Sequence, residues 1–240
     1  MATTTPPNTI DRRKLLFVSA VIATTAVAGT MIYSLLRPAP RADVARRPAR
    51  RPRPTVNVTQ EELLKPGTLP DLVLGSANAP VTIVEYASMT CPHCASFHNK
   101  VLPMLKEKYI DTGKVRLVFR EFPLDERAAL ASMLARCAGG DRSLPLISML
   151  FSKQDEWATA GKDDFMPKIF KLGQQVGMTK QTFDECRKNE KLIKDIIAVR
   201  DRANQSFGVT QTPAFFVNGK KTEGITIEDF EKAITPLIKG

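Results

Sequence analysis

The sequence predicts an α/β protein in which a block of helices interrupts the sheet-forming part. Three observations support this fold class. Two runs rich in β-branched residues, 81–86 and 115–119, flank a stretch with helical periodicity. Residues 124–204 show helical patterns throughout. The chain then closes with two short extended runs and an amphipathic stretch over 227–238.

The first part of the predicted core is a strand–helix–strand unit. Between the two β-branched runs, apolar side chains recur at spacings of three and four residues, which places them on one face of a helix: Cys94, Phe97, Val101, Leu105 and Tyr109. Pro103 predicts a kink in this helix, and Gly113 ends the connection. Two strands joined through a helix should be parallel.

A short helix is expected before this unit. Thr59-Gln60-Glu61-Glu62 has the spacing of a capping box, and Pro66-Gly67 would end the helix. We place the start of the folded domain near Thr55, which gives a domain over residues 55–240. That length is sufficient for one stable core.

The second half of the domain begins with the helical block and ends with a hairpin. Asn218-Gly219 separates Ala214-Phe215-Phe216-Val217 from a second short run, and this dipeptide is typical of a tight hairpin turn. The final helix is expected over residues 227–238. The helices of the block are expected at about 125–138, 144–157, 162–173, 179–188 and 189–204.

Residues 1–36 have the pattern of a signal sequence or membrane anchor. A positive cluster at 12–14 precedes 22 uncharged residues, 15–36, which as a helix would be about 33 Å long and could cross a bilayer. One interpretation is a retained anchor; the other is a signal peptide cleaved near Ala26-Val27-Ala28. We favour the anchor because apolar residues continue past that site. The pair Arg12-Arg13 also permits a twin-arginine export route.

Residues 37–54 form a Pro/Arg-rich linker, for which an extended, semi-rigid spacer is expected. Seven arginines in this segment would favour its cytoplasmic placement, which conflicts with the oxidising compartment inferred below; one hypothesis is that they lie along anionic headgroups. Of the net charge of +10, residues 1–54 carry +8 and residues 55–240 carry only +2. The folded domain therefore lacks the basic excess of a nucleic-acid-binding protein, and we expect no nucleic-acid partner.

The chemistry is predicted at Cys91-Pro92-His93-Cys94, directly after a strand and at the start of a helix. Unpaired N–H groups at a helix start favour an anion, so the thiolate of Cys91 should be stabilised there. Cys94 lies one helical turn further and can form a disulfide with Cys91. Pro92 suits the first turn, and His93 can add positive charge beside the thiolate.

Other uses of these cysteines fit the sequence less well. A zinc site needs further ligands at suitable spacing, and the two histidines, His93 and His98, do not supply them; we expect no metal. Haem attachment would require histidine directly after Cys94, where Ala95 stands. An inert structural disulfide remains an alternative, although the strand-to-helix position favours redox work. Thr212-Pro213 precedes a predicted strand and on its own would be an ordinary trans peptide.

Taken together, residues 71–240 resemble the DsbA-like thiol oxidoreductases of the thioredoxin superfamily. The resemblance rests on Cys91-Pro92-His93-Cys94, on the helical insertion at about 124–204, and on the segment 208–213, which ends in Thr212-Pro213. The Pro-His dipeptide is the one found in the oxidase branch. The resemblance implies a thioredoxin fold with an inserted helical subdomain.

The resemblance also assigns roles to individual residues. Pro213 would be cis and lie against the active-site cysteines, and the backbone of Thr212 would pair with the substrate peptide like an added strand. Glu85 would be a buried carboxylate that tunes the thiol and relays protons; the alternative is a strand end that faces solvent. We interpret His98 as structural.

Cys137 and Cys186 form a separate pair within the helical block. In an oxidising compartment four cysteines divide into one catalytic and one structural pair, and some DsbA-like proteins have a second pair in this subdomain. We therefore favour a structural disulfide between them. Two buried free thiols that pack as small apolar groups remain the alternative.

The resemblance implies a thiol:disulfide oxidoreductase that introduces disulfides into unfolded or reduced exported proteins and needs no cofactor. A DsbB-like, quinone-linked membrane protein would reoxidise it. The expected location is the bacterial periplasm, with a tether at residues 15–36 if the anchor is retained. A monomer is expected because residues 55–76 are too short for a dimerisation domain. The alternatives are a reductase or isomerase of the same family, a redox-inactive peptide-binding adaptor, and the glutathione-dependent relatives, which usually lack an intact C-x-x-C.

Overall fold

The computed structural model describes residues 58–238. The expected signal or anchor at 1–36 and the linker at 37–54 lie outside the described residues. Within the described part of the chain, no helix combines the length and the apolar character needed to cross a membrane.

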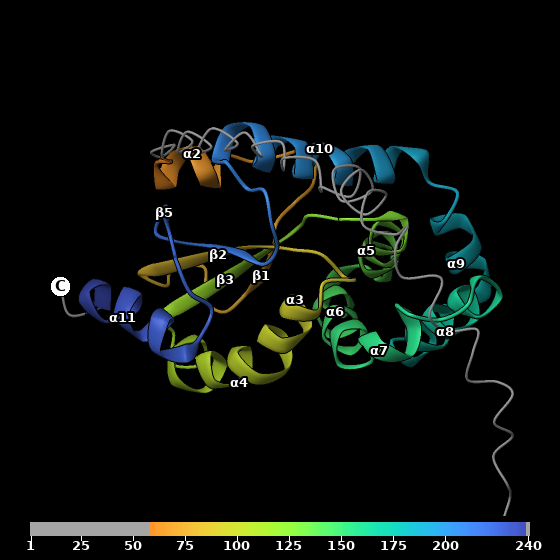
Figure 1. The fold of residues 1–240 in the computed structure, drawn as a ribbon, viewed down its shortest axis with the longest axis horizontal. Helices are drawn as coiled ribbons and strands as arrows, with labels where there is room; N and C mark the ends of the chain where they lie inside the picture. Colours follow the sequence, from red (N-terminus) through yellow and green to blue (C-terminus); the bar gives the residue numbers. More distant parts are fainter. Residues whose placement is uncertain (1–57, 239–240) are drawn as a thin grey trace, which may run out of the picture. The chain divides into compact units, whose positions relative to one another are not determined.

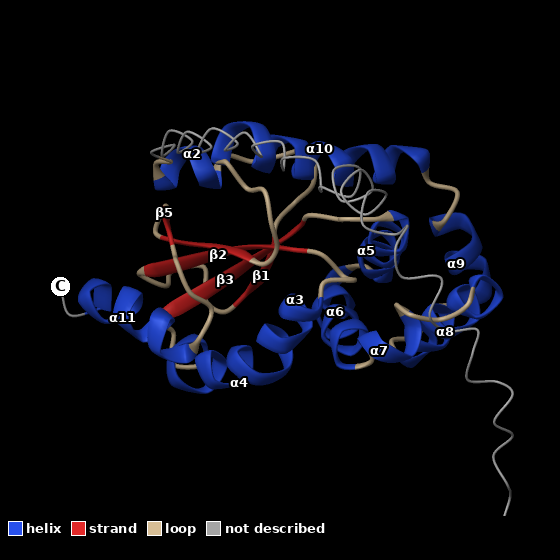
Figure 2. Ribbon diagram, in the orientation of Figure 1, coloured by secondary structure: helices blue, strands red, loops and turns tan. Residues whose placement is uncertain are grey.

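A five-stranded mixed sheet forms the centre of the domain (Figure 2). Its strand order is β1-β3-β2-β4-β5. β2 and β3 are parallel, as the strand–helix–strand pattern predicted, and the other neighbouring pairs are antiparallel. The strands are β1 (Leu72–Leu74), β2 (Val81–Ala87), β3 (Val115–Glu121), β4 (Ala214–Val217) and β5 (Lys220–Lys221).

The predicted hairpin joins β4 to β5. Asn218 and Gly219 both have positive φ, 45° and 85°, as the tight turn between two antiparallel strands requires. β1 was not predicted from the sequence. It is only three residues long and pairs with β3, so its stability comes from a partner that lies more than 40 positions away.

Side chains of β2 alternate between the two faces of the sheet, and this alternation decides where Glu85 lies. Val81 and Ile83 pack against the helix that starts at Pro92 and against α11 (Ile227–Ile238). These helices lie below the sheet in Figure 1. Val84 and Tyr86 pack on the other face, against α2 (Gln60–Leu64) and α10 (Glu190–Phe207). Because strand side chains alternate, Glu85 points to the same face as Ile83.

The helix that follows β2 is continuous from Pro92 to Ile110 but changes its winding. It contains α3 (Pro92–Ser96) and α4 (Leu102–Leu105), each followed by a π-helical turn, η2 (Phe97–Val101) and η3 (Lys106–Ile110). Pro103 lies just after η2, where the peptide N–H of Leu102 donates to the carbonyl oxygen of Phe97. A wider turn at this point accommodates a residue that has no N–H to donate.

The helical insertion lies beside the sheet (Figure 1), and its apolar core is continuous with Ala87 of β2, Phe119 of β3 and Cys94 of α3. The predicted helix 144–157 is two helices that meet at Lys153. The last helix predicted within the block, 189–204, extends to Phe207 in the structure. Its C-terminal part packs on the sheet through Ala203 and Phe207 rather than within the insertion. The helices between β3 and α10 are α5 (Glu126–Ala138), η4 (Gly140–Arg142), α6 (Ser143–Ser152), α7 (Gln154–Trp157), α8 (Lys162–Gln175) and α9 (Lys180–Cys186).

Candidate active site

Cys91 and Cys94 lie where β2 gives way to α3. Cys91 is the N-cap residue of α3, and Pro92 occupies the first helical turn. Both cysteines carry free thiols. Pro92 and His93 are exposed, whereas Cys91 is only 6% exposed and Cys94 is fully buried. The pair therefore has one sulfur near the surface and one in the core.

The environment of Cys91 favours its thiolate. A hydrogen bond from the Cys94 thiol is the largest cause, and it helps to lower the pKa of Cys91 to about 5 although burial acts in the opposite direction. The hydroxyl of Thr212 and the backbone N–H groups of Cys94 and His93 act in the same sense as the Cys94 thiol. These N–H groups belong to the first turn of α3, where backbone N–H groups have no hydrogen-bond partner within the helix.

The environment of Cys94 has the opposite effect. Burial raises the pKa of its thiol far above the usual range, and both the hydrogen bond to Cys91 and the negative charge of Glu85 raise it further. Near neutral pH the reduced pair is therefore a Cys91 thiolate beside a Cys94 thiol. Since the thiolate is the attacking and leaving species in disulfide exchange, Cys91 is the residue that can react with an external partner.

The Thr212–Pro213 peptide lies directly opposite Cys91 and is cis. It comes immediately before β4, which pairs with β2 and so brings this loop to the end of β2 that carries the cysteines. The Cys91 thiol donates to the carbonyl oxygen of Thr212, with a sulfur–oxygen distance of 3.3 Å. The Thr212 hydroxyl is buried and has no hydrogen-bond partner among the described residues.

Glu85 is buried beneath this pair and does not face solvent. Its carboxylate is fully buried and accepts hydrogen bonds from Nε2 of His98, at 3.1 and 3.0 Å to its two oxygens. The alternative of a solvent-facing strand end is therefore wrong. His98, interpreted from the sequence as structural, is the residue that contacts Glu85 directly.

A family model described as Thioredoxin matches residues 68–235. The chain belongs to the thioredoxin family. Its similarity to solved structures places it among the DsbA-like members: a crystal structure of Wolbachia pipientis alpha-DsbA1 has a TM-score of 0.68 and 32% sequence identity, with 75% of this chain and 96% of that chain covered.

Two further matches are consistent with this placement. A Rickettsia bellii protein described as a protein-disulfide oxidoreductase is 36% identical over 170 residues, which are 70% of this chain and 65% of that protein. The match to the Rickettsia typhi relative spans 60% of its length. The crystal structure of oxidised BdbD from Bacillus subtilis, at 23% identity and a TM-score of 0.64 over 71% of this chain and 94% of that chain, shares the fold.

In this thioredoxin-family protein the helical insertion holds the loop that carries Cys91. Gln154 of α7 is buried, and its side-chain amide donates to the carbonyl oxygens of Met89 and Cys91, at 2.8 and 3.0 Å. From α5, the N-cap residue Asp125 accepts a hydrogen bond from the Thr90 hydroxyl at 2.6 Å. Gln154 therefore fixes the backbone on both sides of Thr90, and Asp125 holds the Thr90 side chain between them.

Sequence reasoning did not identify Gln154, Asp125 or Thr90. Gln154 and Cys91 are 63 positions apart, and a single glutamine in a helix carries no motif. The Asp125 side chain gave a usable signal, because Asp is a preferred N-cap residue. That signal predicts the start of α5 but not the contact with Thr90.

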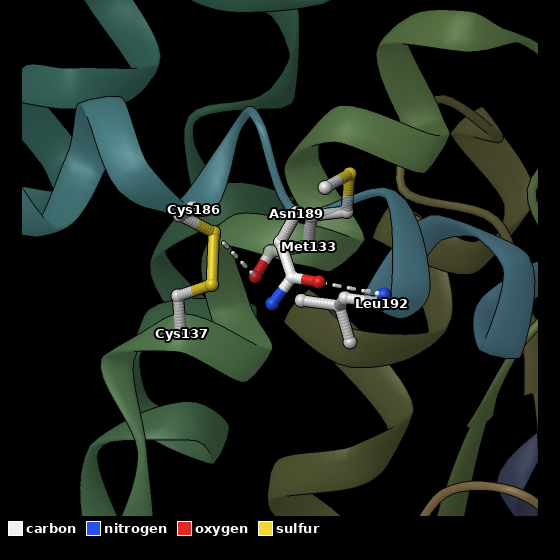
Figure 3. Close-up of a disulfide and its surroundings, with 5 residues drawn as sticks. All are labelled: Met133, Cys137, Cys186, Asn189 and Leu192. Carbon is white, nitrogen blue, oxygen red and sulfur yellow. Dashed lines mark hydrogen bonds between the residues drawn. A yellow bond between two sulfur atoms is a disulfide. The ribbon is translucent and has the colours of Figure 1, made fainter.

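Cys137 and Cys186 form a disulfide, with 6.0 Å between their Cα atoms (Figure 3). The bond joins the C-terminal end of α5 to that of α9, where the Cys186 sulfur also lies 3.2 Å from the carbonyl oxygen of Met133. The N-cap of α5, Asp125, is at the other end of that helix, about 18 Å away along its axis. The disulfide therefore lies apart from the Cys91–Cys94 pair.

Proposed function

We propose that this protein is a thiol:disulfide oxidoreductase that works as an oxidase and introduces disulfides into reduced exported proteins. The observation that carries the proposal is the asymmetry between the two thiols. The pKa of Cys91 is lowered to about 5, whereas burial raises that of Cys94. A stabilised Cys91 thiolate stabilises the reduced protein relative to the disulfide form, and so makes the disulfide a stronger oxidant.

The reaction begins with the Cys91–Cys94 disulfide. A substrate thiolate attacks the sulfur of Cys91, a mixed disulfide forms, and Cys94 leaves with the electron pair of the broken bond. A second substrate thiolate then attacks the substrate sulfur of the mixed disulfide. The substrate leaves with a disulfide, and Cys91 leaves as the thiolate that its surroundings stabilise.

The loop opposite Cys91 offers the substrate a place to bind. Cys91 lies against the carbonyl oxygen of Thr212, two residues before β4 begins. An extended substrate segment that hydrogen-bonds to the backbone of Thr212 would place its own sulfur next to that of Cys91. The partners we propose are unfolded or reduced exported proteins and a DsbB-like, quinone-linked membrane protein that restores the disulfide. The compartment we propose is the bacterial periplasm.

The test is oxidation of a reduced two-cysteine peptide by the oxidised protein, followed by thiol quantification. We expect one peptide disulfide per protein, and none with Cys91→Ser. If the disulfide form leaves the peptide reduced while the dithiol form reduces a disulfide-bonded peptide, the protein is a reductase or isomerase. If Cys91→Ser restores the function of a deletion strain, the protein is a binding adaptor and the proposal is wrong.

A further inference from the structure

Glu85 lies between aromatic residues of the two neighbouring strands. Glu85 is in register with Phe119 on β3 and with Phe215 on β4, so a phenylalanine flanks it on both neighbouring strands. Each of these three residues is at most 1% exposed to solvent. Burial of a carboxylate costs free energy unless it is paired and hydrogen-bonded. The residue that pairs with Glu85 therefore contributes to any chemical role of this carboxylate.

His98 provides this pairing, and its ring is held in a fixed orientation. Nε2 lies 3.1 and 3.0 Å from the two carboxylate oxygens of Glu85. The imidazole stacks on Phe151 of α6, with 4.1 Å between ring centroids, and the edge of Phe119 meets it from β3. The hydrogen bond from the next residue, Asn99, to the carbonyl oxygen of Phe151 is separate from these contacts of the His98 ring.

Cys94, Glu85 and His98 differ in their exposure to solvent. Cys94 and Glu85 have no exposed surface, whereas the His98 side chain is 5% exposed. Glu85 is close enough to Cys94 for its charge to raise the pKa of that thiol. Of the three groups, only His98 reaches solvent.

The proposed reaction requires a proton at this buried position. Cys94 leaves as a thiolate when its bond to Cys91 breaks, and thiols of high pKa leave slowly. Cys94 has a raised pKa and no contact with water. A proton delivered to its sulfur as the bond breaks would remove this barrier, since a positioned acid acts on the group where charge develops.

We propose that His98 is the positioning residue that supplies this proton through Glu85. The inference rests on the proposed function. As the S–S bond breaks and its electron pair moves to Cys94, the His98 imidazolium gives its Nε2 proton to the Glu85 carboxylate, and Glu85 passes a proton to the Cys94 sulfur. The imidazole then recovers a proton from solvent. In reoxidation the same proton returns from Cys94 to Glu85 and His98 as Cys94 attacks the mixed disulfide.

Cys94 on α3 and His98 on η2 are the titratable groups that face Glu85. The side chains that pack on His98 from β3, α6 and its own helix are the uncharged rings of Phe119, Phe151 and Phe97. Among residues 58–238, no other charged side chain forms a hydrogen bond or ion pair with Glu85 or His98.

The experiment measures reduction of the oxidised full-length protein by dithiothreitol in single turnovers, from pH 5 to 9, by acid quench and thiol counting. His98→Gln keeps an N–H donor for Glu85 but cannot titrate. We expect the first-order rate at pH 7 to fall by about 100-fold, the lower range for loss of a positioned acid or base, and the solvent deuterium isotope effect to change. Glu85→Gln should give the same loss, and the double variant should lose no more than either one.

Asn99→Ala is the matched control, because it removes a hydrogen bond from the same turn without touching the proton path. It should keep the wild-type pH profile and rate. If Asn99→Ala slows the reaction as much as His98→Gln does, or if the losses from His98→Gln and Glu85→Gln multiply, the proposal is overturned. The dithiothreitol reaction tests the relay even if the wild-type protein fails to oxidise peptides, so failure of the proposed function is seen separately.

Discussion

The sulfur of Cys91 lies 3.3 Å from the carbonyl oxygen of Thr212, a residue 121 positions later in the chain. Pairing of β4 with β2 brings the two together. The same residue offers a carbonyl that accepts from the Cys91 thiol and a buried hydroxyl that helps to lower the pKa of Cys91.

Removal of the Thr212 hydroxyl should raise the pKa of Cys91. Thr212→Val keeps the shape of the side chain and the backbone carbonyl but removes one donor to the thiolate. A hydrogen bond to a charged group contributes about 1.5 kcal/mol, which corresponds to a rise of about one unit in the pKa. The measurement is thiolate absorbance of the reduced protein between pH 3 and 9. An unchanged midpoint would show that the hydroxyl does not donate to the sulfur.

The lowered pKa of Cys91 should make the stability of the reduced protein depend on pH. The pKa is about 5 in the folded state and about 8.5 in an unfolded chain. A group whose pKa is depressed by folding stabilises the protein above its unfolded pKa and loses that contribution as pH falls through the folded value.

The free energy of unfolding of reduced wild-type protein, relative to reduced Cys91→Ser, should therefore increase between pH 5 and pH 8. Urea unfolding of the two proteins, followed by circular dichroism, gives this difference directly. The serine variant titrates through the same other groups, so their effects cancel. A difference that stays constant across this range would contradict a depressed pKa of Cys91.

Some of the elements that position these residues could be predicted from the sequence, and others could not. The strand–helix–strand unit, the parallel pairing of β2 and β3, the hairpin at Asn218-Gly219 and the last helix follow from local patterns, and the structure confirms them. The Cys91–Cys94 motif is local in the same sense. β1 could not be predicted, because three residues carry little periodicity and their pairing is with a distant strand.

Side-chain contacts between different elements could not be predicted from the sequence either, because they also depend on how distant parts of the chain pack. The contact between Glu85 and His98 depends on which face of β2 carries position 85 and on how far the next helix rotates before position 98. The π-helical turn over Phe97–Val101 changes that rotation. Gln154 reaches Cys91 from a four-residue helix, and nothing in its neighbourhood in the chain marks it.

The disulfide between Cys137 and Cys186 should stabilise the domain without affecting the chemistry. It closes a loop over a sequence separation of 49 residues, and in the chain-entropy model such a crosslink contributes roughly 4 kcal/mol. The double variant Cys137→Ala/Cys186→Ala should lose free energy of unfolding on that scale while the pKa of Cys91 stays the same. A shift in that pKa would show that the disulfide is coupled to the active site.

Loss of the Gln154 amide should affect both stability and reactivity. Gln154→Leu keeps the volume of this buried side chain but leaves the Met89 carbonyl without its donor, which costs about 1–3 kcal/mol. It also frees the loop that positions Cys91, so the rate of mixed-disulfide formation with a thiol peptide should fall. Gln174, also in a helix of the insertion but exposed to solvent, offers a Gln174→Leu control for the same substitution, which should leave that rate unchanged. Equal effects of the two variants would rule out a positioning role.

The central claim is that the reduced form is stabilised through a Cys91 thiolate beside a Cys94 thiol, and the equilibrium redox potential of this pair in glutathione buffers tests it most directly. We predict a potential more oxidising than that of the glutathione couple. It should fall by about 30 mV per pH unit between pH 6 and 8, since only one proton is taken up with the two electrons. A potential near thioredoxin's, about −270 mV, with a slope of about 59 mV per pH unit, would contradict the account.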